Sequence, residues 1–134
     1  MPDSTHLKKV IVYDFGEVEL FDNYLIMVMN RGVTVIPDYN DVLLNLAETH
    51  FKNKPFVYIT HRKNSYAVDP SVYKLTSKIK NLVGFAVISD SSIATKTVPV
   101  EKLFFNKPFE LFSTLEEGIS WANTLVEAAK KEKF

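Results

Sequence analysis

Apolar runs in the amino-terminal part of the chain predict three β-strands. They cover residues 10–15 (VIVYDF), 17–21 (EVELF) and 24–29 (YLIMVM), separated by Gly16 and by a polar Asp-Asn pair that suits a turn. Connections this short require neighbouring strands to run antiparallel. Residues 24–29 are apolar on both alternating faces. We therefore expect this strand to be covered on both sides, either by helices of the same chain or by a partner subunit.

A short apolar run at 33–36 precedes the first predicted helix. Pro37 and Asp38 are expected to begin it, because proline suits a first turn and aspartate can cap it. One face of this helix is apolar at spacings of three and four, and consists of Tyr39, Val42, Leu43, Leu46, Ala47 and His50. We interpret His50 as a boundary residue of this packing face and not as a ligand-binding residue.

The middle of the chain predicts a βαβ unit. A strand at 56–60 is followed by a helix that opens at Asp69-Pro70 and then by an almost entirely apolar strand at 81–89. The helix has an apolar face made of Val72, Leu75, Thr76 and Ile79. A strand as apolar as 81–89 is typical of the interior of a parallel sheet, between two layers of helices.

The carboxyl-terminal part predicts a helix at 90–105 with an irregularity at Pro99, a strand at 109–112, and a final helix. Ser113 and Glu116 have the spacing of a capping box for that helix. Its buried face is expected to consist of Leu115, Ile119, Ala122, Leu125, Val126 and Ala129, with Trp121 at the margin. The fold class is α/β: one domain over 1–134 with a core at about 10–126 and frayed termini, a mixed sheet with antiparallel amino-terminal strands, and about four helices.

The composition agrees with one folded domain and excludes several kinds of chemistry. The chain has 134 residues, of which 46% are hydrophobic and 24% charged. It has no cysteine, which excludes disulfides, thiolate nucleophiles and cysteine-bound metal centres. Its histidines lie far apart and lack the spacing of a metal site. We expect neither a metal nor another cofactor.

Charge and hydropathy narrow the range of partners. The formal net charge is zero, which argues against a protein that binds nucleic acid through its phosphates. No apolar run approaches the roughly 20 residues that cross a bilayer, and the amino terminus lacks the apolar segment of a secretory signal. We therefore expect no membrane insertion and a cytoplasmic location.

The segment that follows the strand at 56–60 holds the candidate binding site. His61, Arg62 and Lys63 are consecutive and can each carry positive charge, at a strand end where open α/β sheets bind ligands. Asp69, at the start of the next helix, would repel an anion from that helix terminus. We therefore expect a displaced anion site, with Arg62 as the anchor because its planar group can bind a carboxylate or phosphate through two hydrogen bonds.

Asn64 and Ser65 complete this candidate anion-binding set. In the alternative interpretation, Arg62 and Lys63 are solvated on an exposed connection, Asn64 and Ser65 serve a turn, and Tyr66 folds back on the core.

Three stretches resemble the SpoIIAA-like or STAS-like family, relatives of the sulfate transporter and anti-sigma factor antagonist domain. They are 55–73 (PFVYITHRKNSYAVDPSVY), 81–89 (NLVGFAVIS) and 109–125 (FELFSTLEEGISWANTL), and the likeness extends from about 10 to 126. The chain is similar to the small stand-alone bacterial members. The resemblance implies a mixed sheet with helices packed on it, and a role in binding or regulation and not in catalysis.

Antagonist members of the family carry a phosphorylatable serine where the helix after the central strand begins, in an Asp-Ser-Ser/Thr-Gly motif. Ser71 has that place here, but the motif is missing, so Ser71 is an alternative phosphosite on the strength of its position alone. Asp90-Ser91-Ser92 is closer to the motif but follows the next strand, which is the wrong element.

Two further functions stay open. STAS-like domains resemble the Sec14-type lipid carrier, and the aromatic content here would suit a lipid or small apolar ligand, although aromatic residues on strands usually fill the core. A hydrolase would use His61 with Ser65 and Asp69, yet no known nucleophile or phosphate-binding motif is present. We expect a non-enzymatic regulatory or protein-interaction module with an unidentified protein partner, a homodimer through uncovered strand or helix surface, and a small anion or lipid as ligand.

Overall fold

The chain folds as an α/β protein, and its described residues form a six-stranded mixed sheet and four α-helices. The computed structural model describes residues 7–35, 39–62, 67–68 and 71–132. Its elements along the chain are β1 (Lys9–Tyr13), β2 (Gly16–Leu20), β3 (Tyr24–Met29), β4 (Thr34–Val35), α1 (Asn40–Thr49), β5 (Phe56–His61), β6 (Ala67–Val68), α2 (Ser71–Thr76), β7 (Leu82–Ile88), α3 (Ser92–Glu101), the 3-10 helix η3 (Lys102–Phe104), β8 (Phe109–Phe112) and α4 (Leu115–Lys131).

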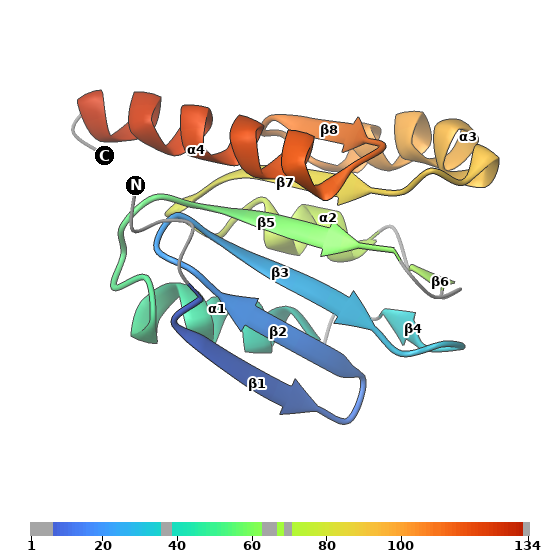
Figure 1. Cartoon of the computed structure of the whole chain (residues 1–134), viewed down its shortest axis with the longest axis horizontal. Coiled ribbons are helices and arrows are strands. Elements are labelled where there is room, and N and C mark those ends of the chain that lie inside the picture. The colour runs from blue at the N-terminus through green and yellow to red at the C-terminus, as the bar shows by residue number, and fades with distance from the viewer. Residues whose placement is uncertain (1–6, 36–38, 63–66, 69–70, 133–134) are drawn as a thin grey trace.

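The strand order in the sheet is β1-β2-β3-β5-β7-β8 (Figure 1). The first three strands are antiparallel neighbours, as their short connections predicted, and β3, β5, β7 and β8 are parallel. The predicted βαβ unit is therefore confirmed as β5–α2–β7. The two-residue strands β4 and β6 pair in a small separate sheet, and this pairing was not expected from the sequence.

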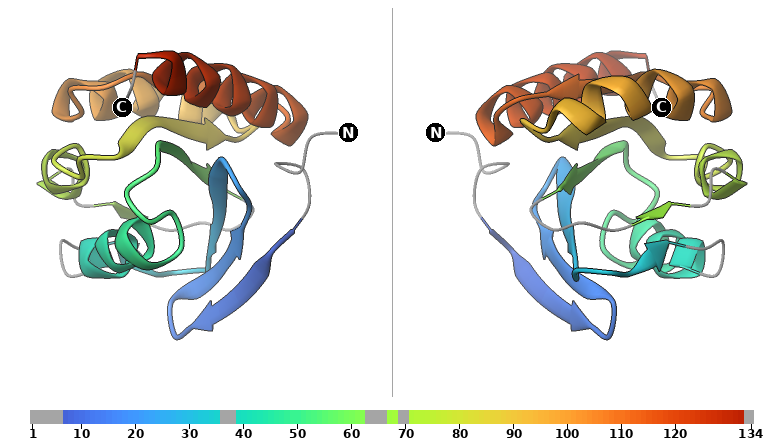
Figure 2. Two further views of the ribbon diagram at one scale, coloured as in Figure 1. Left: turned by 90° about the vertical axis from the view of Figure 1, so that its left-hand side faces the viewer. Right: turned by 90° about the vertical axis from the view of Figure 1, so that its right-hand side faces the viewer.

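Helices cover both faces of the sheet (Figure 2). On one face, α1, α2 and α3 pack on a cluster that includes Leu25, Met27, Tyr58 and Phe85. On the other face, α4 packs on Tyr24, Ile26, Val57, Ile59, Ala86 and Ile88 through Ala122 and Val126. Apolar side chains from several strands, aliphatic and aromatic, thus lie between two helical layers, and this burial is the main stabilising contribution to the fold.

Both faces of β3 are covered by helices of the same chain. Leu25, Met27 and Met29 belong to the cluster beneath α1, and Tyr24 and Ile26 to the cluster beneath α4. Helices of the same chain therefore explain why both faces of β3 are apolar. The alternative that a partner subunit covers one face is not needed for this strand.

The helix starts differ in part from the sequence expectations. α1 begins at Asn40 and α2 at Ser71, while Pro37, Asp38 and the Asp69-Pro70 pair lie outside the described residues. Pro99 stays inside α3, and the irregularity comes later, where the helix tightens into η3.

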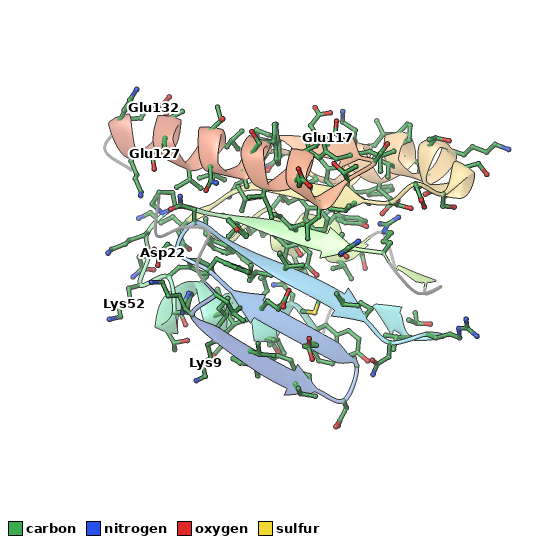
Figure 3. The ribbon with its side chains drawn as sticks, viewed as in Figure 1. Lys9, Asp22, Lys52, Glu117, Glu127 and Glu132 are labelled. Carbon is green, nitrogen blue, oxygen red and sulfur yellow. The ribbon has the colours of Figure 1, made fainter. Side chains whose placement is uncertain are left out.

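The capping box of α4 was predicted one residue too early. Thr114 is the N-cap: its side chain accepts a hydrogen bond from the Glu117 backbone N–H, and the Glu117 side chain accepts one from the Thr114 backbone. Ser113 and Glu116 have the same spacing, but Thr114 is the residue with extended backbone before the first helical turn. Figure 3 shows Glu117 near one end of α4 and Glu132 beyond the other.

Two glycines allow α4 to lie close to the sheet. A Cβ on Gly84 of β7 would come within 2.8 Å of Leu125 Cδ2 and 3.0 Å of Trp121 Cη2. A Cβ on Gly118 would come within 2.4 Å of Ile88 Cδ1. The half-buried Trp121 packs at the margin of this contact, as predicted, whereas the sequence did not indicate that Gly118 would be buried.

Candidate functional site

A pocket lies between the sheet and helices α1 and α2, at the carboxyl-terminal halves of β3 and β5. Open α/β sheets bind their ligands at this edge, where parallel strands end and the following helices begin. The pocket is lined by Phe15, Met27, Met29, Tyr39, Asn40, Leu43, Tyr58, Thr60, Arg62, Val72, Tyr73, Thr76 and Phe85. The segment in which the binding site was predicted, after the end of β5, thus begins next to this pocket.

The pocket is small and mostly apolar. It encloses about 40 Å³, which is room for about three water molecules at roughly 10–15 Å³ each. Ligand pockets for drug-sized molecules are about 300–1,000 Å³. An acyl chain would therefore require the helices to move, whereas a ligand of a few carbon atoms would need a much smaller adjustment.

Polar groups in the pocket wall contact one another. The Thr76 hydroxyl lies 2.9 Å from both Asn40 Oδ1 and the Val72 carbonyl, which links the first turn of α1 to the end of α2. Thr60, on β5, is buried in the same wall. These contacts fix the positions of the helices that form the pocket roof.

Arg62 joins the pocket to α3 through a charged pair. Its Nη2 lies 2.5 Å from Glu101 Oε1 and its Nη1 lies 3.3 Å from Glu101 Oε2, so the two groups meet through two hydrogen bonds. The Tyr73 hydroxyl donates to the same Glu101 oxygen and lies 3.4 Å from Arg62 Nη2. The Arg62 and Glu101 side chains are only 16% and 12% exposed.

Arg62 determines the charge state of Glu101. Burial of the carboxylate would by itself raise its pKa, but the hydrogen bonds and positive charge of Arg62 outweigh this effect, with smaller contributions from Tyr73 and Thr97. The pKa of Glu101 therefore lies below its ordinary value of 4.5. At neutral pH the carboxylate is ionised, and it neutralises the charge of Arg62.

The sequence-predicted site residues are only partly brought together. His61 is the half-buried last residue of β5, opposite Ile88 in the register, and Arg62 follows it. The Arg62 side chain is largely buried and pairs with Glu101. This differs from both sequence interpretations, in which Arg62 was either the anchor of an anion site or a solvated residue of an exposed connection. Ser71 is the exposed first residue of α2.

Five other residues of this segment lie outside the described part of the chain: Lys63, Asn64, Ser65, Tyr66 and Asp69. The anion site and the His61 hydrolase therefore stay predictions where they depend on these residues.

Sequence reasoning missed Glu101 and Tyr73. A signal for Glu101 was present, because Val98, Glu101 and Phe105 recur at the spacing of one helical face and both apolar members are buried. A carboxylate on an apolar face requires a partner, and a buried arginine is the usual one.

The histidine at the end of α1 has a structural role. His50 Nε2 lies 2.9 Å from the Phe21 carbonyl oxygen, and its ring meets Phe51 edge-on. His50 is half-buried, as expected of a boundary residue, and it connects α1 to the β2–β3 turn.

Comparison with known proteins identifies no family for this chain. No protein-family model, curated protein or solved structure matches this chain. Among the described residues, no group of three or more histidine, aspartate or glutamate side chains could hold a metal ion. Over the same part of the chain, none of the helices combines the length and the apolar character that a membrane crossing requires.

Proposed function

We propose that the protein is a non-enzymatic, cytoplasmic regulatory module of the STAS-like type that binds a small anion with a short apolar body. The observation that carries this proposal is the pocket at the ends of β3 and β5, whose apolar walls meet one charged pair, Arg62–Glu101. The strand order, with antiparallel strands followed by parallel strands and helices, is compatible with the STAS-like resemblance.

The ligand would place its apolar part against Met27, Met29 and Leu43 and its anionic group toward Arg62. A guanidinium binds carboxylate and phosphate with matched geometry, so either group would fit. The volume of about 40 Å³ supports a short carboxylate over a long-chain lipid. The apolar lining also supports a second candidate, a small uncharged apolar ligand.

Binding of an anion would compete with Glu101 for Arg62. Glu101 is the last residue of α3, so its release would uncouple α3 and η3 from the end of β5. Val100 and Leu103, which flank Glu101 in the chain, are 54% and 82% exposed. Exposed apolar side chains of this kind suit contact with a protein partner. The pocket and a partner-binding surface would then be coupled through one ion pair.

A thermal-shift titration tests the proposal. Acetate, butyrate, benzoate and phosphate are compared with chloride at equal ionic strength and pH. We expect a short-chain carboxylate to raise the melting temperature, since a ligand at one hundred times its Kd stabilises the folded state by about 2.7 kcal/mol. A small uncharged ligand such as phenol serves as the probe for the second candidate.

Two variants make the test specific to Arg62. In Glu101→Gln the competing carboxylate is lost, so the anion should bind more tightly. In the double variant Arg62→Gln/Glu101→Gln no charge is left unpaired, and the response to the anion should disappear. Lys102→Gln removes an exposed positive charge that pairs with Glu110 and is the matched control. Equal anion responses in all four proteins, or none with any anion, would contradict the proposal.

The phosphosite remains an alternative form of regulation. Ser71 is exposed, so a kinase could reach it. Intact-mass measurement of protein purified from its own cells tests it, because an unmodified mass in several growth states would exclude this use of Ser71.

A further inference from the structure

The sheet ends on one side in an edge strand with exposed apolar side chains. β1 is the first strand in the order, and no described strand pairs with its outer side. Val10 is 42% exposed and Val12 is 75% exposed. They lie on the same side of the sheet as α4, since Val10 pairs with Glu19 and Glu19 with Ile26, but neither belongs to the cluster beneath α4. Figures 1 and 2 show β1 at the border of the molecule, far from α4. An edge strand of this kind is a template for pairing with another strand.

The usual protections of an edge strand are weak in β1. It contains no proline, and its five residues pair with β2 in an uninterrupted register. Its one charge, Lys9, lies at the beginning of the strand and points away from the rest of the chain (Figure 3). The opposite edge is different: β8 follows Pro108, and its exposed Glu110 pairs with Lys102 of η3. Open pairing surface is thus concentrated on β1.

The sequence of β1 is complementary to itself when two copies run antiparallel. With the strand KVIVY paired about Ile11, Lys9 of one copy lies opposite Tyr13 of the other, and Val10 lies opposite Val12. Lysine beside an aromatic ring is a favourable pair, and two valines from each copy would cover one another. Pairing about Val10 would place Lys9 against Ile11, and pairing about Val12 would place Asp14 against Val10. The register centred on Ile11 is the one without such mismatches.

We propose that β1 is a self-association surface at which a second copy of this chain pairs antiparallel about Ile11, so that the two sheets become continuous. This interface is independent of the pocket. A single pair of short strands buries a small area, so the dimer is a weak one that forms and dissociates with concentration.

Sedimentation velocity over a wide concentration range is the first test. The apparent mass should rise from that of a monomer toward twice that value. Val12→Lys should remain monomeric at every concentration, and it should fold normally because Val12 is 75% exposed and lies opposite Glu17. Leu44→Lys is the matched control, since Leu44 is a 41% exposed residue of α1 outside β1, and it should dimerise like the wild type. A wild type that stays monomeric throughout overturns the proposal.

Disulfide cross-linking tests the register. The chain has no cysteine, so an introduced one reports on a single position. Ile11→Cys lies on the symmetry axis and should form a disulfide-linked dimer under mild oxidation, faster than Ser120→Cys at an exposed position of α4. Because Ile11 packs on the core, a second experiment uses exposed sites: an equimolar mixture of Val10→Cys and Val12→Cys should cross-link to a heterodimer faster than either alone. Rates equal to that of Ser120→Cys overturn this register.

Discussion

Arg62 Nη2 lies 2.5 Å from Glu101 Oε1, although the two residues are 39 positions apart in the chain. The pair holds the end of β5 against the end of α3. Because both side chains are largely buried, removal of one partner would leave the other charge desolvated and unpaired. The Arg62–Glu101 pair is therefore central to the stability of this edge of the protein as well as to its proposed response to ligand.

Glu101→Gln should make the protein less sensitive to acid. The pKa of Glu101 in the folded protein lies below the value of 4.5 taken for the unfolded chain. The unfolded chain therefore binds a proton first as the pH falls, and the wild type loses stability below that value until the folded group is also protonated. The variant lacks this loss.

Urea unfolding midpoints measured from neutral to acidic pH check the Glu101 prediction. Glu110→Gln is the matched control, because the Glu110 carboxylate is 51% exposed and pairs only at the surface with Lys102. If the urea midpoint falls equally steeply with decreasing pH in the wild type and in Glu101→Gln, the prediction is contradicted.

Lys107→Met should destabilise the protein by about 1.5–3 kcal/mol, because hydrogen bonds from a charged donor are among the stronger ones. Lys107 Nζ donates to the carbonyl oxygens of Ile79 and Leu82 at 2.6 and 2.7 Å, and so connects the loop before β8 to the turn before β7. Chemical denaturation measures the loss. Lys102→Met is the control, since its exposed ion pair should contribute about 0–1 kcal/mol; equal losses in both variants would refute the role of Lys107.

Gly118→Ala should destabilise the protein although alanine is the better helix former. Alanine at a helix interior normally gains about 1 kcal/mol over glycine. Here the new Cβ would meet Ile88 Cδ1 at 2.4 Å in a packed layer, and overpacking costs about 1–3 kcal/mol.

A double-mutant cycle isolates the contact behind the Gly118 prediction. Ile88→Val removes the Cδ1 atom, so Gly118→Ala should cost less in that background than in the wild type. Ser120→Ala, at an exposed position of the same helix, should be neutral or slightly stabilising. A stabilised Gly118→Ala protein would show that the helix can move away from β7 without cost.

Tyr24→Phe should reduce the loss of stability in alkaline solution. Burial, with a smaller contribution from the charge of Glu19, raises the pKa of Tyr24 from 10.0 to about 12. The unfolded chain therefore releases this proton first, and the wild type loses stability as the pH rises from 10.0 toward 12. Unfolding midpoints across this range should fall more steeply for the wild type than for the variant, and equal slopes would count against the assignment.

Element type was predictable wherever burial imposes a period on the sequence. Residues 24–29 and the strands within 56–60 and 81–89 are buried on both faces, and their continuous apolar runs identified them directly. The weak elements were harder to identify. Two-residue β6 has too few residues to show any alternation, and its pairing with β4 depends on how distant segments are placed.

The candidate site stays a prediction, and the sequence indicated its surroundings only in part. The rule for strand ends pointed to the end of β5, and Arg62 at that end lines a pocket. The neutralising partner comes from α3, and nothing local to residues 61–71 indicates a carboxylate contributed by a helix 39 positions away. The N-cap of α4 was predicted at Ser113 and lies at Thr114 for a related reason. Both residues are followed three positions later by a glutamate, and only the backbone conformation, which the sequence does not show, distinguishes them.

The face of the sheet beneath α4 is built from β3, β5 and β7, all of which precede α4 in the chain. During synthesis these strands are complete while their cover is still inside the ribosome. Until α4 emerges, the nascent chain offers water an apolar surface on one side of a nearly finished sheet. During that time, chaperones that recognise extended apolar segments could bind this surface. A chain truncated before Leu115 would lack α4, and the surface would stay exposed.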